Sequence, residues 1–415
     1  MRMAVLSVGA KMLGGLLEGI GTGRRDEPVV CRCGARMESR GLKTKELVTI
    51  LGRVSYSRSM FLCPVCGQTR YPGDEELDIV DTIFSPALRR IMARMGGKST
   101  FRESSEDIKV CAGVEVNAKA VERVAEAVGE DMERWYTREH GEAARGRDEH
   151  RAAGDNKTIP TLYIEMDGTG VPMTPWALKG RKGKQPDGSA RTREVKLGCV
   201  FTQTETDDKG RPIRDPDSTS FVGKIEPAEQ FGLRLYGEAV RRGLGKAEQT
   251  VVLGDGAAWI TGIVETHFPT ATQIIDLYHA REHVSELCKM LFSSDEAKTQ
   301  EYRTRWWTLL DDGQVETILR EVQRHLPRSG NRRKKATSEI AYLSRNKERM
   351  RYGQFRARGL FVGSGVVEAG CKTIIGQRLK QSGMEWSLRG ANAIISLRCM
   401  LKSNRLDDYW ESRAA

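Results

Sequence analysis

Three acidic residues lie where a metal-dependent phosphodiester chemistry would need carboxylates. Asp167 follows the apolar segment TLYIEM and precedes Gly168, and Asp255 follows QTVVLG and precedes Gly256. Glu368 lies in GSGVVEAGCK, near the expected start of a helix. A carboxylate at the end of a buried strand costs desolvation free energy, which a divalent cation offsets directly. The three acids together can hold two Mg²⁺ or Mn²⁺ ions about 4 Å apart.

Each of these acids taken singly would more often cap a turn than bind a metal, so the prediction depends on all three. Glu165 lies two residues before Asp167 and therefore faces the same side of the strand. It could share the metal or cap a solvent edge. The glycine beside Asp167 favours Asp167 as the ligand, because glycine lets backbone and substrate approach closely.

The segment DLYHAREH carries a further cluster of polar residues. Asp276 follows another apolar run, and His279 and His283 are one helical turn apart. HAREH also matches H-x-x-E-H, the inverted zinc-protease motif, with Glu282 as the base. No clear third-ligand motif follows it, and a five-residue pattern in a charged helix is weak, so a protease is disfavoured.

Four cysteines form the strongest local signal. They are two close pairs, Cys31-x-Cys33 and Cys63-x-x-Cys66, the second within CPVCG. Four thiolates from two tight turns suit tetrahedral Zn²⁺, and we predict a structural zinc site. Isolated core cysteines are the alternative, although core packing alone rarely produces such close pairs. Basic residues surround the segment and suggest contact with DNA: Lys43, Lys45, Arg53, Arg58 and Arg70.

The composition is that of a folded protein with a polyanionic partner. The chain has 415 residues, 39% of them hydrophobic and 30% charged, with a net charge of +11. It contains no run of about 18 apolar residues that could span a membrane. Residues 3–20 are interrupted by Lys11 and Glu18, which favours an amphipathic helix over a signal peptide. Nine cysteines, most of them scattered, indicate reduced thiols in a cytoplasmic protein.

Hydrophobic patterning predicts an α/β region after about residue 158. Strands are expected near 161–167, 194–204, 218–225, 249–255 and 270–276, with helices at 227–243, 257–267 and 295–358. Before this region, three short helices at about 86–95, 102–110 and 118–132 suggest a helix-turn-helix module, or equally a helical spacer. Basic segments at 179–196 and 328–358 would track phosphates. Three tryptophans could stack on bases, although core packing is the more common role: Trp176, Trp259 and Trp386. Trp386 is the best candidate of the three, because it follows the helix expected to carry Glu368.

Taken together, the motifs resemble those of bacterial insertion-sequence transposases of the DDE type. More narrowly they resemble the Kra-type branch, which is related to Mutator-like transposases. The resembling stretches run from about residue 28 to 402 and include CRCG…CPVCG, YIEMDGTGVPM, VVLGDGAAWI, FPTATQIIDLYHAREH, GSGVVEAGCKTIIGQRLKQSGMEWS and RGANAIISLR. The resemblance implies an α/β fold with a ribonuclease-H-like catalytic core and an all-helical insertion, preceded by a zinc ribbon and a helical DNA-binding domain.

The resemblance also assigns roles to particular residues. Asp167, Asp255 and Glu368 match the three metal-binding catalytic acids. Asp276 and His279 match the Asp-x-x-His signature, in which the histidine shapes the site or contacts the cleaved strand. The implied cofactors are Mg²⁺ or Mn²⁺ at the catalytic site and a structural Zn²⁺. The implied partner is double-stranded DNA, bound by a homodimer or higher oligomer in the cytoplasm, at the nucleoid.

We expect eight segments along the chain. They are an N-terminal helix and tether at 1–27, a zinc ribbon at 28–74, a helical DNA-binding domain at 75–137, a linker at 138–158, the first part of the core at 159–292, the helical insertion at 293–358, the second part of the core at 359–402 and a tail at 403–415.

Two other functions fit the same residues. A structure-selective nuclease would use the same acids to cut DNA without joining strands. A zinc-dependent DNA-binding regulator could keep an inactive, captured transposase core, but such a core tends to lose an acid, and all three acids are present here.

Overall fold

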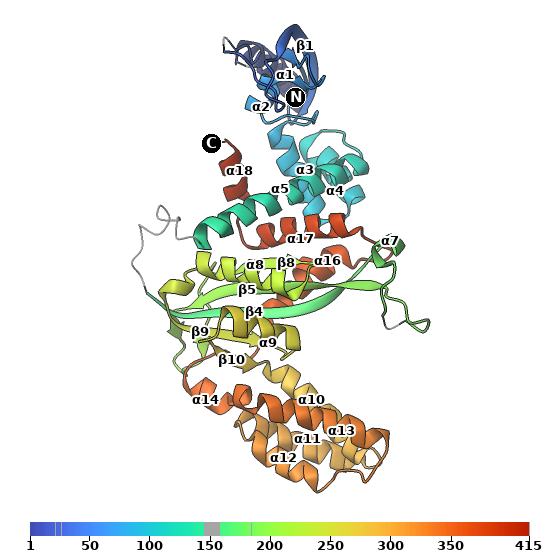
Figure 1. Cartoon of the computed structure of the whole chain (residues 1–415), viewed down its shortest axis with the longest axis vertical. Coiled ribbons are helices and arrows are strands. Elements are labelled where there is room, and N and C mark those ends of the chain that lie inside the picture. The colour runs from blue at the N-terminus through green and yellow to red at the C-terminus, as the bar shows by residue number, and fades with distance from the viewer. Residues whose placement is uncertain (21, 26, 145–157, 184, 415) are drawn as a thin grey trace. The chain divides into compact units, whose positions relative to one another are not determined.

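The protein divides into two compact units. The computed structural model describes residues 1–20, 22–25, 27–144, 158–183 and 185–414 (Figure 1). The first unit contains Met1–Met132 and Arg405–Ala415, and the second contains Glu133–Asn404. None of the described helices has the length and apolar character that crossing a lipid bilayer requires.

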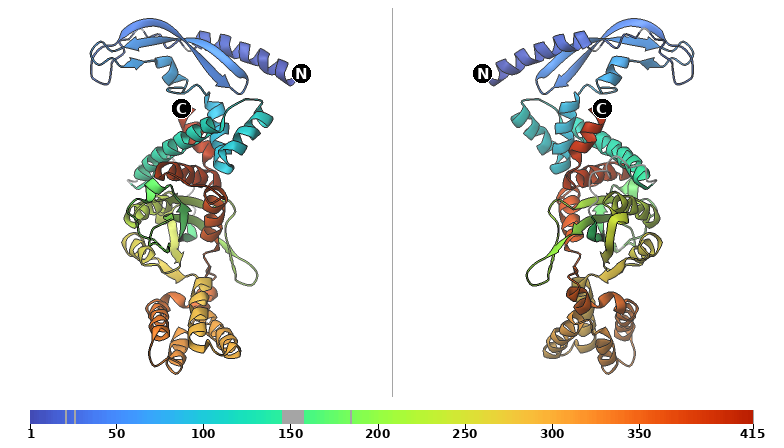
Figure 2. Two further views of the ribbon diagram at one scale, coloured as in Figure 1. Left: turned by 90° about the vertical axis from the view of Figure 1, so that its right-hand side faces the viewer. Right: turned by 90° about the vertical axis from the view of Figure 1, so that its left-hand side faces the viewer.

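An antiparallel β-hairpin organises the start of the first unit. Its strands are β1 (Glu38–Thr49) and β2 (Gly52–Leu62), and the two-residue strand β3 (Thr69–Arg70) pairs with β2. Helix α1 (Arg2–Ile20) packs along β2 (Figure 2). The first half of β1 is solvent-exposed and is held by its pairing with β2.

The three predicted helices are present, and the third continues past Met132, where the first unit ends. They are α3 (Pro86–Lys98), α4 (Phe101–Ala112) and α5 (Ala118–Ala144). The side chain of Ser85 accepts the Leu88 N–H at the start of α3, and Thr100 forms a capping box at the start of α4. Gly113 ends α4 with φ 72°, which favours glycine.

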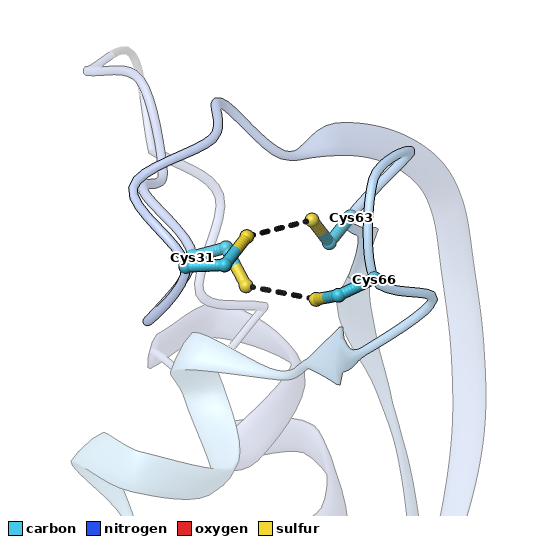
Figure 3. A group of neighbouring side chains, drawn as sticks. Cys31, Cys63 and Cys66 are labelled. Atoms are coloured by element: carbon cyan, nitrogen blue, oxygen red, sulfur yellow. Dashed lines mark hydrogen bonds between the residues drawn. The ribbon is translucent and has the colours of Figure 1, made fainter.

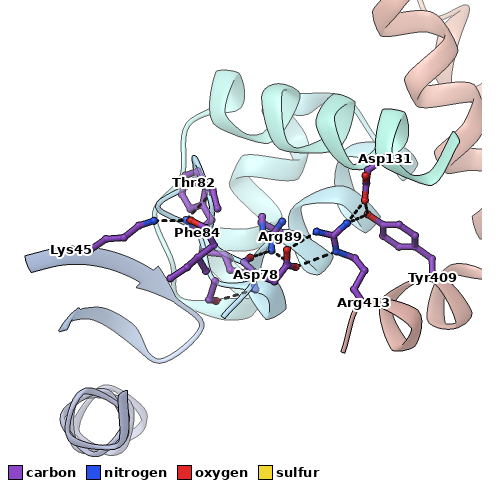
Figure 4. Close-up of polar contacts among 11 residues, drawn as sticks. Lys45, Asp78, Thr82, Phe84, Arg89, Asp131, Tyr409 and Arg413 are labelled. Atoms are coloured by element: carbon purple, nitrogen blue, oxygen red, sulfur yellow. Dashed lines mark hydrogen bonds and ion pairs between the residues drawn. The ribbon is translucent and has the colours of Figure 1, made fainter. Parts of the chain in front are cut away.

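The predicted C-terminal tail is a helix of the first unit, α18 (Leu406–Ala414). Its Arg413 forms ion pairs with Asp78, at 2.5 Å, and with Asp131 (Figure 4). The Tyr409 hydroxyl also donates to Asp131, at 2.7 Å. These contacts fix the last helix against the loop after the short helix α2 (Pro72–Glu76) and against α5.

A five-stranded mixed sheet forms the centre of the second unit, in the order β10-β9-β4-β5-β8. The strands are β4 (Ile159–Pro172), β5 (Thr192–Gln203), β8 (Ser220–Lys224), β9 (Ala247–Gly254) and β10 (Thr272–Ile275). Strands β4, β5 and β8 are antiparallel neighbours, whereas β9 and β10 run parallel to β4. All five lie close to the predicted positions, which confirms a mixed α/β architecture.

One predicted boundary is wrong. Strand β4 does not end at Asp167 but runs to Pro172, because it keeps its antiparallel pairing with β5 after its parallel neighbour β9 has ended at Gly254.

Helices cover both faces of the sheet. Helices α8 (Ala228–Arg241) and α9 (Ala258–His267) lie on one face. The other face carries α15 (Gly365–Gly370), the π-helical turn η3 (Cys371–Gly376) and α17 (Leu388–Lys402). Glycines allow both layers to approach closely: a Cβ on Gly198 would lie 2.8 Å from Leu235 of α8.

The segment predicted as an insertion, 293–358, is helical. It contains α11 (Glu296–Asp311), α12 (Val315–Gln323), α13 (Asn331–Asn346) and α14 (Tyr352–Ala357), and α10 (Leu277–Phe292) leads into it from β10. They enclose a core of their own, which includes Trp306, Leu310, Ile318 and Leu343.

The start of the predicted linker is helical. Helix α5 continues to Ala144, so residues 138–144 are not a linker, and residues 145–157 lie outside the described part of the chain. The reason is a buried anchor on α8: Glu238 accepts hydrogen bonds from the Tyr136 hydroxyl at 2.5 Å and from His140 Nε2 at 3.0 Å. Burial acts to raise the pKa of Glu238, but Arg241 and His140 outweigh it and hold that pKa well below its usual range.

Glu238→Ala should destabilise the second unit by about 3–5 kcal/mol, because it leaves the buried Arg241 cation without its partner. Urea unfolding would measure this change. Glu229→Ala, at an exposed position of the same helix, is the control and should change stability by less than about 0.5 kcal/mol. If the two variants are equally stable, Glu238 does not stabilise the second unit as described.

Candidate functional site

The four predicted cysteines converge in the first unit, and Figure 3 labels three of them, Cys31, Cys63 and Cys66. The Sγ atoms of Cys31 and Cys66 are 3.5 Å apart, as are those of Cys33 and Cys63. All four sulfur atoms lie within 4.8 Å of one another, which suits a tetrahedral ion with sulfur ligands. The backbone N–H of Cys66 is the main cause that lowers the pKa of Cys63 to about 6, against the opposing effect of burial. The group therefore could hold a structural zinc ion.

Most of the basic residues predicted to surround this segment have carboxylate partners. Lys45 and Arg58 both pair with the buried Asp74, at 2.9 and 2.8 Å. Arg53 pairs with Glu46, and Arg70 binds Glu75 through two nitrogens. Their charges are largely compensated within the unit, which weakens the sequence argument that this segment binds DNA.

Three of the candidate acids lie at one level of three neighbouring parallel strands, Asp167 within β4 and Asp255 and Asp276 directly after β9 and β10. Glu165 of β4 pairs with Leu253 of β9, so Asp167 and Asp255 are each two positions further along. Gly254 pairs with Ile275 of β10, so Asp276 is level with Asp255. Neighbouring strands are about 4.8 Å apart, so the sheet register itself brings the three positions together.

Glu368 lies on α15, on the helix layer that these acids face. Asp167 pairs with Leu197, and the Leu197 side chain packs against Gly370 of α15. Burial raises the pKa of Glu368, and the negative charges of Asp276 and Asp167 raise it further. The structure therefore brings Glu368 close enough to Asp276 and Asp167 for their charges to act on it.

The carboxylates are near one another without forming a closed ligand set. Among the described residues, only the four cysteines bring three or more potential ligand atoms within 4.8 Å of one another. The carboxylates do not meet this criterion. Asp167 Oδ1 accepts the Gly168 N–H at 2.7 Å, and Asp255 Oδ1 accepts the Ala257 N–H at 2.8 Å. Gly256, with φ 80°, permits the turn that Asp255 caps.

Both carboxylate oxygens of Asp276 already accept hydrogen bonds from the protein, so neither is freely available to a metal ion. Its Oδ1 accepts the His279 N–H at 2.7 Å and so caps α10. Its Oδ2 accepts the Ser364 N–H at 2.6 Å and the Ser364 hydroxyl at 3.0 Å. Asp276 thus connects the end of β10, the start of α10 and the turn that precedes α15.

His279 and His283 face each other on α10, with 3.2 Å between their Nε2 atoms. The Nδ1 atom of His283 lies 2.5 Å from Glu339 of α13, and the His283 ring stacks on Tyr342 at 3.8 Å. The Tyr342 hydroxyl donates to the backbone oxygen of Asp255 at 2.8 Å. The sequence offered no signal for Glu339 or Tyr342, which are more than 50 residues away along the chain.

Glu165 is fully buried, which excludes the solvent-edge interpretation. Its Oε2 accepts the Val367 N–H at 2.8 Å and so ties β4 to α15. Burial is the main cause that raises the pKa of Glu165 to about 8, and the negative charge of Asp276 raises it further, so the carboxyl is protonated at neutral pH.

The tryptophans have different surroundings. Trp176 is 83% exposed, whereas Trp386 is buried and donates its Nε1–H to the Leu379 carbonyl at 3.0 Å. Trp259 is half-buried, with Lys196 Nζ 5.3 Å from its ring. Trp386 is therefore a core residue, and Trp176 is the most exposed candidate for stacking on a base.

Two lysines near the acids do not stand out in the sequence. Lys372 lies one turn after Glu368 and acts to lower the Glu368 pKa. Lys380 donates to the Thr169 hydroxyl at 2.5 Å. The spacing of four residues between Glu368 and Lys372 could have indicated that they share a helix face.

The purified protein should contain about one zinc ion per chain, because four converging thiolates leave no ligand position open. Elemental analysis would measure it, and Cys63→Ala should lower the content and unfold the hairpin segment. Cys111→Ala, at an exposed cysteine of α4, is the matched control. A well-folded preparation without metal would contradict the zinc site.

Glu165→Gln should fold well at neutral pH, because the amide replaces a neutral carboxyl of the same shape. Since folding raises the pKa of Glu165 from 4.5 to about 8, the folded chain keeps a proton that the unfolded chain releases. The free energy of unfolding should therefore fall as pH rises from about 5 to about 8. This fall should be smaller in Glu165→Gln, as measured by urea unfolding across that range. Identical pH profiles would contradict a protonated Glu165.

Comparisons with known proteins give one family match and distant relatives. The profile of an uncharacterised protein family, UPF0236, matches residues 242–408. A UPF0236 protein of Caldanaerobacter subterraneus subsp. tengcongensis is 23% identical over 378 residues, which cover 86% of this chain and 68% of that protein. Among solved structures, the Drosophila P element transposase strand transfer complex aligns over 81% of this chain and 82% of that chain. That alignment has 10% identity and a TM-score of 0.26, a value that does not establish a common fold.

Proposed function

We propose that the protein is a DNA transposase of the DDE type, which cleaves the ends of its own mobile element and joins them to target DNA. The observation that carries the proposal is the register of the sheet. It sets Asp167 and Asp255 at one level of neighbouring strands, and the charge of Asp167 reaches Glu368 on α15, where it acts to raise the Glu368 pKa. The assignment to the Kra-type branch stays a prediction from the sequence.

The strand arrangement supports a ribonuclease-H-like core. Three antiparallel strands, β4, β5 and β8, are followed by two strands that extend the sheet in parallel from the other side of β4. The helical insertion enters after the fifth strand and ends shortly before the helix with the third acid. This is the order that the sequence resemblance implies.

The donor set fits hard divalent cations. Asp167, Asp255 and Glu368 offer oxygen ligands alone, which Mg²⁺ and Mn²⁺ prefer. Bound there, such ions would polarise phosphoryl oxygens and lower the pKa of water. Three carboxylates repel one another, and a shared cation offsets that repulsion, so the acids are expected to move closer together when a metal binds.

The remaining side chains would act on the substrate. Lys372 and Lys380 lie beside the acids and offer positive charge to DNA phosphates. Trp176, with its exposed ring, can stack on an unpaired base. His279, at the start of α10, is available to the cleaved strand.

A repeated gene is a further argument for a mobile element. The name of the Caldanaerobacter relative joins eleven numbered designations, which is what a gene present at many places in one genome would carry. Two alternatives use the same residues: a nuclease that does not join strands, and a DNA-binding regulator with an inactive core.

Asp167→Ala, Asp255→Ala and Glu368→Ala should each abolish Mn²⁺-dependent cleavage of DNA that carries the element ends, since each removes a metal ligand. DNA binding should stay within about twofold, because phosphate contacts dominate affinity. Asp208→Ala, at an exposed loop position, is the control and should cleave normally.

The same assay separates the three functions. Joined donor–target products from the purified wild-type protein support the transposase, and cleavage without joining supports the nuclease. Binding without cleavage by the wild-type protein supports the regulator. Full cleavage by any of the three acid variants would contradict the assignment of the catalytic acids.

A further inference from the structure

A chain of hydrogen-bonding groups runs from the helical insertion to His279. Glu339 Oε2 of α13 lies 2.5 Å from His283 Nδ1, and His283 Nε2 lies 3.2 Å from His279 Nε2. The first contact is largely shielded from water, because the Glu339 and His283 side chains are 19% and 24% exposed. The last group, His279, is 36% exposed.

The chemistry of each group determines which nitrogen atoms in this series carry the protons. An ionised carboxylate only accepts hydrogen bonds, so Glu339 requires the proton of His283 on Nδ1. The Nε2 atom of a neutral His283 is then an acceptor, which requires a proton on His279 Nε2. The Nδ1 atom of His279 is left as the nitrogen that faces outward. Its carboxylate neighbour is Glu282 Oε2, at 3.6 Å, on a side chain that is 78% exposed.

Packing holds Glu339, His283 and His279 in place beside the candidate acids. The Tyr342 ring stacks on His283 with an angle of 21° between the planes, which prevents the imidazole from rotating freely. The Tyr342 hydroxyl is bonded to the backbone of Asp255, and Asp276 accepts the backbone N–H of His279. The insertion, the second strand-end acid and His279 are therefore mechanically connected.

We propose that Glu339 and His283 are positioning residues, which fix the protons of His279 so that Nδ1 is the atom offered to a DNA phosphate. A phosphate oxygen would take the place of the exposed Glu282 carboxylate. Because a phosphate oxygen only accepts hydrogen bonds, His279 would then be the imidazolium, which keeps its proton on Nε2 toward His283 and takes a second proton from solvent on Nδ1 to donate to the phosphate. The phosphate part rests on the proposed function, whereas the proton arrangement does not. The helical insertion then orients a group at the site as well as extending the DNA-binding surface.

Nitrogen NMR of the free protein tests the proton arrangement without any DNA. The chain has six histidines, so ¹⁵N-histidine labelling gives few signals, and His283→Gln and His279→Gln assign the two. His283 should carry its proton on Nδ1, and His279 should carry one on Nε2. In Glu339→Gln the amide can donate as well as accept, so these preferences should weaken.

The matched control is Glu316→Gln, which removes a carboxylate that pairs with Arg351 elsewhere in the insertion. It should leave both histidine signals unchanged. A wild-type His283 with its proton on Nε2, or a Glu339→Gln spectrum identical to the wild type, overturns the proposal.

Cleavage kinetics test the consequence for the site. Loss of a carboxylate that orients a functional histidine typically lowers activity about 10-fold to 100-fold, and we expect this loss in the turnover rate of Glu339→Gln, with DNA affinity unchanged. Glu316→Gln should cleave normally. If Glu339→Gln cleaves at the wild-type rate, the positioning role is wrong. If the wild-type protein cleaves no DNA, the proposed function fails, and the NMR result still decides the proton arrangement.

Discussion

The register of three parallel strands is the constraint on which the rest of the second unit depends. Backbone hydrogen bonds, and not side-chain contacts, set Asp167, Asp255 and Asp276 at one edge of the sheet. Such a gathering of negative charge is unfavourable by itself, because like charges at close range repel. The groups that bind neighbouring elements to this end of the sheet therefore stabilise it without adding negative charge.

Glu165 illustrates how a further acid is accommodated. It ties α15 to β4 through the Val367 N–H, directly behind the strand-end acids. If it were ionised, it would add a buried negative charge beside Asp276. Burial raises its pKa to about 8, so the neutral carboxyl can keep the hydrogen bond. The result is a helix that carries Glu368 and is fixed in place by an uncharged group.

The sequence predicts most of the strands because apolar runs ending in Asp-Gly or Asp-Leu are local signals. The cysteine pairs are local in the same way, and their convergence follows from a single hairpin. The functions of Asp276 and Glu165 are not local, since they depend on Ser364 and Val367, some 90 and 200 residues away. The end of β4 is misplaced for a similar reason, because pairing with β5 extends the strand past Asp167.

The helical insertion also completes the backbone hydrogen bonding of the sheet edge. A strand that ends inside a protein leaves carbonyl groups that need donors. The Tyr342 hydroxyl donates to the Asp255 carbonyl at 2.8 Å, and the buried Tyr352 hydroxyl donates to the Ile275 carbonyl at 3.0 Å. Both tyrosines come from the insertion, so the helices that interrupt the core also satisfy the ends of β9 and β10. An insertion with these contacts cannot be a passive appendage, because removing it would leave two carbonyl groups beside the acids without their donors.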